Sequence, residues 1–402
     1  MITCLFAVLT LADRAAAQPC EYEIAHIIEG PPCPQFSTPT PQLQAINDHN
    51  EVVGYYTVCN IGNDRAFYWS EATGLVTLQF PFPIFSSRAY DINNDGLICG
   101  THTLTGSNFG PVGFAMKPDG TEYQFLGFLP GGNFSEATAI NDAAQVTGYA
   151  NATGTTTEAF IWQDGVMTGL RAALGQPRSR ANDINNDGWV TGWMGSNQFQ
   201  DAVAFMTDGV RVANLGPVPS GVTGEGNAIT SLLTVAGDGL VMSKWGGSLG
   251  QGFYWEGAQS VALELHQGSD DCEAKALDTA GAVMGWCDLP AIDQGLIWKD
   301  DEVTLLSESV CSEELLEVTL IRDVCSATGM IVGNGRLNGE TCGLVFAPTD
   351  PTGDVDGDGV VNGSDLGMLL LNWGQAQTEL DLNGDGTTDG EDLGILLLNW
   401  TQ

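Results

Sequence analysis

Basic side chains are scarce in this chain of 402 residues. Thirteen lysines and arginines stand against 50 aspartates and glutamates, which gives a formal net charge of −37 at pH 7. Binding to nucleic acid or to an anionic membrane requires cationic side chains that neutralise phosphate. This charge balance therefore excludes binding to nucleic acid and disfavours binding to an anionic membrane. The same negative field attracts divalent cations.

Long hydrophobic runs and zinc motifs are also missing. No run beyond the N-terminus approaches the roughly 18 apolar residues of a membrane-spanning helix, so no membrane span is predicted. No CxxC pair occurs and the four histidines are scattered, which disfavours zinc. An apolar run from Ile2 to Ala12 precedes Ala15–Ala17, a pattern typical of a signal peptide over residues 1–17, although the usual basic residues before the run are missing. We therefore expect a secreted, extracellular or cell-surface protein.

The cysteines are few and odd in number once the signal peptide is removed. Cys4 lies in that segment, so nine of the ten cysteines remain and at least one thiol must be free. In an exported protein the others are disulfide candidates. We expect Cys20 to pair with Cys33, and Cys272 with Cys287 across a predicted hairpin. The pairing of the remaining cysteines stays open: Cys59, Cys99, Cys311, Cys325 and Cys342.

Glycine, in contrast, is abundant and marks an internal repeat. Seven landmark glycines each close a Val-rich run, at a period of about 46 residues. They are Gly54, Gly100, Gly148, Gly192, Gly237, Gly285 and Gly333. A second landmark, with Ala-Phe-x-Trp as its best form, keeps the same spacing. It occupies Ala66–Trp69, Gly113–Met116, Ala159–Trp162, Ala204–Met206, Gly252–Trp255, Gly295–Trp298 and Gly343–Phe346.

Each copy contains four short apolar runs, and the first two flank a turn of Asn, Asp and Gly. Such runs predict a β-hairpin followed by two further antiparallel strands, which is one propeller blade. The seventh copy has three strands, at Val318–Val324, Met330–Gly333 and Cys342–Ala347, and lacks the fourth. An orphan strand at residues 21–28 would complete it and remove two exposed sheet edges. The sequence therefore favours a closed seven-bladed β-propeller over residues 18–348 rather than an open β-solenoid.

The repeats resemble the HAF repeat family of bacterial extracellular proteins over roughly residues 40–347. The Ile-Asn turn, the Val-x-Gly run and Ala-Phe-x-Trp carry this resemblance, which implies a secreted propeller-like domain and no established chemistry. It fades in the last three copies, where Thr230, Asp278 and Cys325 replace the turn asparagine.

Two of the turns match the first half of a calcium loop, D-x-N-x-D-G. They begin at Asp91 and Asp183, but the closing positions hold His102 and Met194 instead of an acid. We interpret both as hairpin turns that use Asn, Asp and Gly for positive φ.

The composition changes beyond residue 348. Residues 349–402 contain eleven acids and no lysine or arginine. Two loops in this segment place oxygen ligands at positions 1, 3, 5, 7, 9 and 12, with Gly359 and Gly386 at position 6, as in EF-hand loops. The first set is Asp354, Asp356, Asp358, the Val360 carbonyl, Asn362 and Asp365. The second is Asp381, Asn383, Asp385, the Thr387 carbonyl, Asp389 and Asp392. We predict two bound Ca²⁺ ions.

A short helix with one apolar stripe follows each loop. The stripes are Leu366, Leu369, Leu370 and Trp373, and Leu393, Leu396, Leu397 and Trp400, and we expect most of these side chains to pack between the two helices. Two loop–helix units without an entering helix resemble a type I dockerin over Asp354 to Trp400. The resemblance implies docking to a cohesin-like or cell-surface protein through loop positions 10 and 11, which are Gly363, Ser364, Gly390 and Glu391. We take residues 349–353 as a linker and 354–402 as the module.

Three functions follow from this organisation. A non-catalytic binding or scaffold propeller is favoured, because propellers offer a rigid loop-rich face. Aromatic residues outside the repeat are candidates to stack on sugar rings: Trp189, Trp193, Trp245 and Trp286. The alternative is a polysaccharide hydrolase or lyase, for which the acids that the repeat does not explain are the first candidates: Glu225, Glu273 and Asp288. A purely structural surface protein is the third.

Overall fold

The computed structural model divides the chain into compact units, of which the largest is Ile24–Ala347. The residues that it describes are 21–33, 39–59, 61–106, 108–153, 156–196, 201–217, 223–230, 234–242, 248–256, 259–266, 269, 271–278, 281–289, 293–299, 302–312, 314–349, 353–355, 361–375, 380, 382, 387–398 and 400. The predicted signal peptide therefore lies outside the described residues. Within them, no helix is long and apolar enough to cross a membrane.

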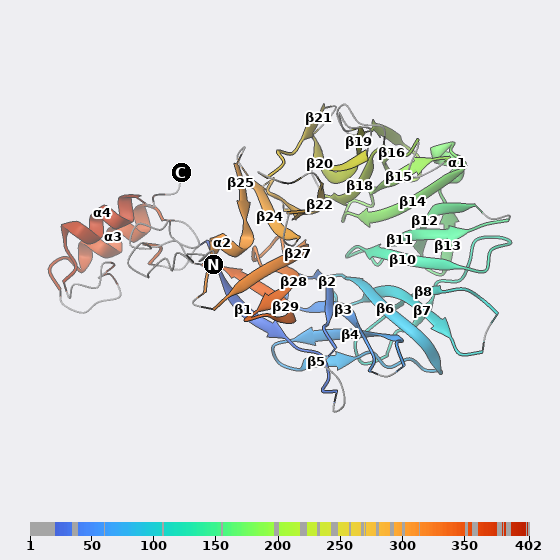
Figure 1. Ribbon diagram of the computed structural model, residues 1–402, viewed down its shortest axis with the longest axis horizontal. Helices are drawn as coiled ribbons and strands as arrows, with labels where there is room; N and C mark the ends of the chain where they lie inside the picture. Colours follow the sequence, from blue (N-terminus) through green and yellow to red (C-terminus); the bar gives the residue numbers. More distant parts are fainter. Residues whose placement is uncertain are drawn as a thin grey trace, which may run out of the picture. The chain divides into compact units, whose positions relative to one another are not determined.

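The unit Ile24–Ala347 is a seven-bladed β-propeller, as the repeat predicted (Figure 1). Six blades are four-stranded antiparallel sheets in chain order. The first blade contains β2 (Gln42–Ile46), β3 (Val52–Thr57), β4 (Asp64–Ser70) and β5 (Gly74–Thr77). The second contains β6 (Ile84–Ile92), β7 (Ile98–Leu104), β8 (Val112–Met116) and β9 (Gln124–Phe125). The third contains β10 (Ser135–Ile140), β11 (Val146–Asn151), β12 (Thr157–Gln163) and β13 (Val166–Gly169).

The next three blades have the same order. The fourth blade contains β14 (Arg178–Ile184), β15 (Val190–Gly195), β16 (Val203–Thr207) and β17 (Val212–Gly216). The fifth contains β18 (Glu225–Ile229), β19 (Val235–Met242), β20 (Ser248–Glu256) and β21 (Gln259–Ala262). The sixth contains β22 (Cys272–Leu277), β23 (Val283–Cys287), β24 (Gln294–Lys299) and β25 (Glu302–Leu305). Two single-turn helices, α1 (Arg171–Leu174) and α2 (Leu306–Ser309), follow outer strands.

The seventh blade combines both ends of the propeller. Its order is β26-β1-β29-β28-β27, and its strands are β26 (Val310–Cys311), β1 (Tyr22–Ile28), β29 (Glu340–Pro348), β28 (Ile331–Leu337) and β27 (Leu316–Val324). The N-terminal strand β1 thus lies beside β29, where the copy lacks its own fourth strand (Figure 1). This pairing covers the edge that β29 would otherwise expose. The short β26 then pairs with β1 as an additional strand.

The core lies between neighbouring blades. The third-strand phenylalanines Phe67, Phe114, Phe160, Phe205 and Phe253 are all fully buried. Each apolar cluster joins two blades; for example, Phe67 packs in one cluster with Val332 and Val345 of the seventh blade. The Ala-Phe-x-Trp landmark therefore forms part of the interblade core, and its burial contributes to the hydrophobic stabilisation of the ring.

The disulfides correct one prediction. Cys33 is bonded to Cys59, with the two Cα atoms 6.3 Å apart, so the predicted Cys20–Cys33 pair is wrong. The segment after β1 brings Cys33 within bonding reach of the end of β3, whereas Cys20 lies outside the described residues. The predicted Cys272–Cys287 pair is confirmed, and it joins directly opposite positions of β22 and β23. Cys99, Cys325 and Cys342 are free and buried.

The C-terminal segment contains two helices, α3 (Gly363–Leu371) and α4 (Gly390–Leu398), as the loop–helix pattern predicted. Their buried core consists of Val361, Leu369, Leu380 and Leu396. With four buried apolar residues among those described here, this core is very small, so apolar burial alone stabilises the segment little.

Candidate functional site

Six of the twelve predicted calcium ligands fall on described residues: Asp354, Asn362, Asp365, Thr387, Asp389 and Asp392. The other six lie outside the described part of the chain: Asp356, Asp358, Val360, Asp381, Asn383 and Asp385. The described ligands are thus positions 1, 9 and 12 of the first loop and positions 7, 9 and 12 of the second.

The two closing aspartates have matching surroundings. One carboxylate oxygen of Asp365 accepts the Val355 N–H at 2.7 Å and the other accepts the Asn362 N–H at 2.7 Å. Asp392 accepts the N–H groups of Leu382 and Asp389 at the same distances. Both side chains are fully buried. Each aspartate therefore ties two backbone positions of its loop to the first turn of the following helix, where Asn362 is the N-cap of α3.

The donor set fits calcium. An ionised carboxylate that is removed from water needs hydrogen bonds and a nearby cation. Residues 349–402 contain no lysine, arginine or histidine that could supply the positive charge, and the predicted ligands are all oxygen atoms, which calcium prefers. Within the described residues no group of three or more His, Cys, Asp or Glu side chains converges, since the ligands at positions 3 and 5 lie outside them.

The apolar stripes are only half buried, which corrects the expectation that most of their side chains pack between the helices. Leu366, Leu369, Leu393 and Leu396 do pack in or against the core. The other four are exposed: Leu370, Trp373, Leu397 and Trp400. Met368 and Leu371, the latter 80% exposed, add to them. The core is too small to cover both flanks of each helix, so the segment presents an apolar surface, which is unusual for residues that stay in water.

The predicted partner-reading positions lie at the helix starts. Gly363, Ser364 and Gly390 are exposed, and a side chain at either glycine would meet nothing within 4 Å. A side chain added at Gly363 or Gly390 would therefore meet no steric obstacle from the rest of the described structure. The Glu391 side chain lies outside what the structure describes.

The propeller contains a second candidate site, built from the repeated Ile-Asn turn. In four consecutive blades the asparagine donates its amide to a backbone carbonyl of the next blade, at 2.8–3.0 Å. The series runs from Asn47 to Asn93, Asn141, Asn185 and the Thr230 carbonyl. The same side chains accept N–H groups of their own turns, for example Leu97 N–H to Asn93 at 2.8 Å. We call these four residues the asparagine clamp, because each holds its own turn and the adjacent blade together.

The half calcium loops have a different role in the structure. One carboxylate oxygen of Asp91 accepts the Ile140 N–H of the next blade at 2.7 Å, and the other accepts its own Ile92 N–H. Asp183 and Asp323 bond Ile229 and Ile46 in the same way. The turns themselves place Gly96 and Gly188 at positive φ, which supports their interpretation as hairpin turns. The interblade bond of the aspartate has no signal in the sequence, because its partner lies one repeat away.

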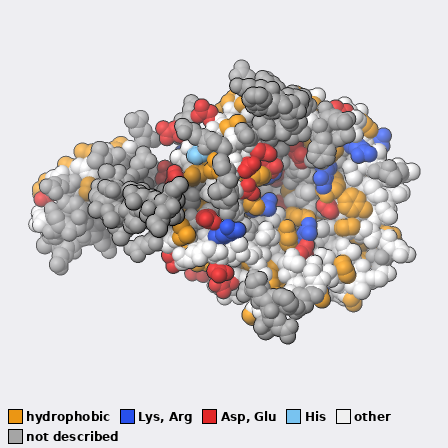
Figure 2. Space-filling model, in the orientation of Figure 1, with side chains coloured by type: hydrophobic (Ala, Val, Ile, Leu, Met, Phe, Trp, Pro, Cys, Tyr) orange, Lys and Arg blue, Asp and Glu red, His pale blue; other side chains and the backbone are white. Residues whose placement is uncertain are grey.

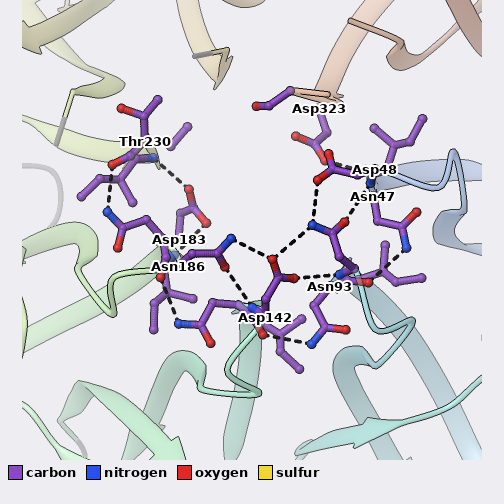
Figure 3. Close-up of a pocket in the computed structure, with 18 of the residues that line it drawn as sticks. Asn47, Asp48, Asn93, Asp142, Asp183, Asn186, Thr230 and Asp323 are labelled. Atoms are coloured by element: carbon purple, nitrogen blue, oxygen red, sulfur yellow. Dashed lines mark hydrogen bonds between the residues drawn. The ribbon is translucent and has the colours of Figure 1, made fainter. Parts of the chain in front are cut away.

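These turns surround a cavity of about 290 Å³ at one end of the central channel (Figure 3). The residue after each clamp asparagine lines its rim. Asp142 accepts the side-chain amides of Asn94 and Asn186, and Asn94 also donates to Asp48. These bonds form a polar chain across four blades (Figure 3). The acids named here already accept hydrogen bonds from side chains of neighbouring blades. The polar groups around this cavity therefore hold the blades together at this end of the ring.

The buried aspartates predict an unusual pH dependence. Burial raises the pKa of Asp91 to about 7 and that of Asp183 to about 6, against 3.8 ordinarily, and the backbone N–H bonds only partly oppose it. Both residues are only partly exposed, and this burial removes water from the carboxylates. The folded state thus binds more protons than the unfolded state between about pH 4 and pH 7. The stability contributed by these two aspartates is therefore fully present below about pH 4 and is lost as the pH rises through the folded-state pKa values of about 6 and 7. The loss is up to about 1.4 kcal/mol per pH unit for each group.

Denaturant unfolding of the propeller at pH 5 and at pH 8 measures this effect. We expect the higher midpoint at pH 5 and a smaller difference in the double variant D91N/D183N, which also controls for the general charge of the chain. Equal differences in both proteins would contradict the assignment.

A second feature of the innermost strands lies next to this cavity and was not predicted from the sequence. Every innermost strand contains a β-bulge at the same position. The extra residues are Gln44, Tyr90, Thr138, Asn182, Asn227, Lys275 and Arg322. A β-bulge changes the direction in which a side chain points. The side chains of Thr138, Asn182 and Asn227 donate hydrogen bonds to backbone carbonyls of the next blade. We call this set the bulge ring. Figure 2 shows acidic and basic side chains gathered around the middle of the propeller face.

The acids suggested for catalysis have other partners. Glu225 accepts the Asn182 amide at 2.8 Å, and Glu273 forms an ion pair with Lys275 at 2.7 Å. Both lie on innermost strands, two residues before the bulge, whereas Asp288 is exposed beyond the end of β23. Of the aromatic candidates, Trp193 is buried and Trp189 packs against an interblade cluster. Trp286 is partly exposed, and Trp245 lies outside the described residues.

Comparison with known proteins agrees with both parts of the chain. Residues 352–397 match the family Dockerin type I domain. No curated protein matches the chain.

Among solved structures, the β-propeller domain of the Trilobed protease from Pyrococcus furiosus, described as having an open velcro topology, is similar with a TM-score of 0.53 and 10% identity, over 76% of this chain and 93% of that one. Pyrococcus horikoshii acylaminoacyl peptidase has a TM-score of 0.49 and 9% identity, over 75% of this chain and 52% of that one. TolB from Acinetobacter baumannii has a TM-score of 0.42 and 11% identity, over 64% of each chain. At such identity the first likeness shows the fold alone. The chain is thus a seven-bladed β-propeller that carries a segment matching the dockerin type I domain.

Proposed function

We propose that this is a secreted or cell-surface protein that attaches, with calcium bound, to a cohesin-type partner through its C-terminal segment, and that its propeller is a non-catalytic binding domain. The observation that carries the proposal is the matched pair of buried aspartates, Asp365 and Asp392. They close two loops of equal ligand spacing, each by bonds to two backbone N–H groups, in a segment without a basic side chain. The match of residues 352–397 to the dockerin type I domain supports the same function.

Calcium would couple directly to attachment. The loops begin with acidic ligands and end inside the first turns of α3 and α4, so metal binding in a loop fixes the start of the helix that follows. Residues 349–402 contain eleven acids, and the core described for this segment has four buried residues, so the repulsion between the acids opposes folding until cations neutralise it. Two ions, one for each loop, are part of this proposal.

The docking surface that we propose is the exposed apolar side of the helices. It comprises Met368, Leu370, Leu371, Trp373, Leu397 and Trp400. Apolar side chains centred in an interface contribute most of its binding energy, while loop positions 10 and 11, which are Gly363, Ser364, Gly390 and Glu391, would adjust specificity. The HAF assignment of the repeats remains a prediction. The enzyme alternative is not favoured, because Glu225 and Glu273 are already engaged within the bulged strands.

Capture of the full chain by a panel of immobilised cohesins tests the proposal. In the presence of calcium we expect saturable binding to at least one cohesin, and L370D and L397D should each weaken it by about tenfold or more, because a charge replaces an apolar contact. Val166→Asp is the matched control, since Val166 is 63% exposed on an outer strand of the propeller. Binding that survives both leucine substitutions, or that V166D weakens equally, would contradict the assigned surface.

A further inference from the structure

A cavity of about 240 Å³ lies between the second and third blades. Strands β6 and β7 of the second blade line it with Ser86, Arg88, Tyr90 and Thr103, and β10 of the third blade lines it with Glu136. All five side chains are exposed or partly exposed, so solvent reaches the cavity. It shares no lining residue with the cavity at the Ile-Asn turns, and none of the roles described above uses it.

The repeat explains why this space is open. The residue after the landmark glycine is Tyr55 in the first blade and Tyr149 in the third. An arginine of the following blade covers each ring: Arg88 lies 4.8 Å from the centre of the Tyr55 ring, and Arg180 lies 3.7 Å from that of Tyr149. In the second blade the same position holds Thr101, which is much smaller and lines the cavity. The space that a tyrosine ring fills at these two neighbouring interfaces is therefore open between the second and third blades, in a fold that otherwise packs closely.

The wall of the cavity has hydrogen-bonding capacity that the protein does not use. One carboxylate oxygen of Glu136 accepts the Tyr149 hydroxyl. Within the described residues, neither the other oxygen of Glu136 nor the Thr103 hydroxyl forms a hydrogen bond. Burial and the charge of Glu136 raise the pKa of Tyr90 to about 12, so this phenol keeps its proton and can donate. The cavity thus offers a strong acceptor together with hydroxyl groups that donate and accept.

Charge and size restrict what can bind there. The wall carries one guanidinium, Arg88, which pairs with Asp64 at 2.6 Å, and one carboxylate, Glu136. An anion would be repelled by Glu136 and by the net charge of −37, and a cation would be repelled by Arg88. A neutral ligand avoids both penalties. Pockets for drug-sized molecules have about 300–1,000 Å³, so this cavity suits a smaller molecule of the size of one sugar ring.

We propose that the cavity between the second and third blades binds one neutral sugar ring of a saccharide, in the place that a tyrosine ring takes at the neighbouring interfaces. The sugar hydroxyls donate to Glu136 and exchange hydrogen bonds with Tyr90 and Thr103, because hydroxyl groups are both donors and acceptors. Pro111, which also lines the cavity, offers an apolar contact for the C–H groups of the ring. This inference rests on the proposed function of the propeller as a binding domain and names its ligand, and it does not depend on calcium.

Titration of the full chain with the methyl glycosides of neutral hexoses tests the inference, with glucuronic acid and glucosamine as charged ligands of similar size. We expect saturable binding of at least one neutral hexoside and at least about tenfold weaker binding of both charged sugars. Thr101→Tyr places in the second blade the ring that the first and third blades have, and it should weaken binding by about tenfold or more because it fills the cavity. Thr168→Tyr is the matched control, since Thr168 is exposed on the outer strand β13.

Several outcomes would overturn the inference. They are the absence of binding by every neutral hexoside, equal binding of a charged sugar, unchanged binding by folded T101Y, and an equal loss of binding in T168Y. If T101Y does not fold, E136Q decides in its place, because glutamine can still accept the Tyr149 hydroxyl but lacks the charged acceptor. Folded E136Q should bind about tenfold more weakly, and unchanged binding would overturn the inference. Repeating the titration with excess chelator separates this test from the attachment proposal, since sugar binding should persist when cohesin capture is lost.

Discussion

Replacement of Asp365 by asparagine is expected to weaken calcium binding at the first loop by at least about 10–100-fold, and D365N/D392N should leave neither loop able to bind calcium at the wild-type affinity. Each carboxylate oxygen accepts a backbone N–H at 2.7 Å. An amide keeps one acceptor but turns an N–H group toward the other donor, so the substitution loses charge and opposes the loop geometry at once.

Calorimetric titration of the calcium-free chain measures this effect. The wild-type chain should bind two ions, each single variant one ion at the original affinity, and the double variant no ion at that affinity. E340Q, a substitution of an exposed acid at the end of a propeller hairpin, should leave both sites unchanged. A double variant that still binds two ions with wild-type affinity would show that Asp365 and Asp392 are not ligands.

Replacement of Asn93 by alanine should destabilise the propeller by about 2–4 kcal/mol, because it leaves the Leu97 N–H without its partner and removes the interblade bond to the Asn141 carbonyl, which then keeps only the Ala144 N–H. The side chain is 4% exposed, donates to the Asn141 carbonyl of the next blade at 3.0 Å and accepts the Leu97 N–H at 2.8 Å. Thr230→Ala should cost less, since Thr230 at the equivalent position of the fifth blade accepts one longer bond, at 3.4 Å.

Urea unfolding of the full chain in calcium gives these differences. Asn214→Ala is the matched control, because that asparagine also caps a local turn but is exposed on an outer strand, and we expect a change within about 0.5 kcal/mol. Equal stability of N93A and the wild-type chain would contradict the interblade role of the asparagine clamp.

The landmark glycines show what the repeat could reveal and what it could not. Their spacing predicted the number of blades, but their physical reason needed coordinates. A Cβ on Gly54 would lie 2.0 Å from the Gln42 carbonyl oxygen, and one on Gly148 would lie 2.0 Å from that of Glu136. The bulge of the innermost strand brings its backbone this close, and a bulge leaves no distinct pattern in a single short strand.

The contacts between repeats were equally hidden. The clamp asparagines looked like turn residues because each also caps its own turn, and their second partner lies 44–48 residues away. The loss of asparagine at Thr230, Asp278 and Cys325 was visible in the sequence, and it marks the blades where the amide clamp stops. Side-chain bonds between repeats form because the closed ring brings neighbouring blades together. The period of the repeat alone does not show which side chains then meet.

In the C-terminal segment the spacing of acids predicted the candidate ligands, and the structure adds the burial of the two closing aspartates. The helical stripes were less informative. Leu369 and Leu370 are adjacent in the stripe, yet the first is fully buried and the second is 53% exposed. Helical periodicity defines an apolar face but not how much of it a small core can cover, so the exposed side could not be predicted.

The central claim is that a self-contained propeller carries a segment that becomes ordered only around calcium, and hydrogen exchange of the full chain tests it most directly. With calcium present, the amides of α3 and α4 should exchange slowly. In excess chelator they should exchange at the rate of an unfolded chain, while the innermost propeller strands keep their protection. Helices that stay equally protected in chelator, or propeller strands that lose protection together with them, would contradict the account.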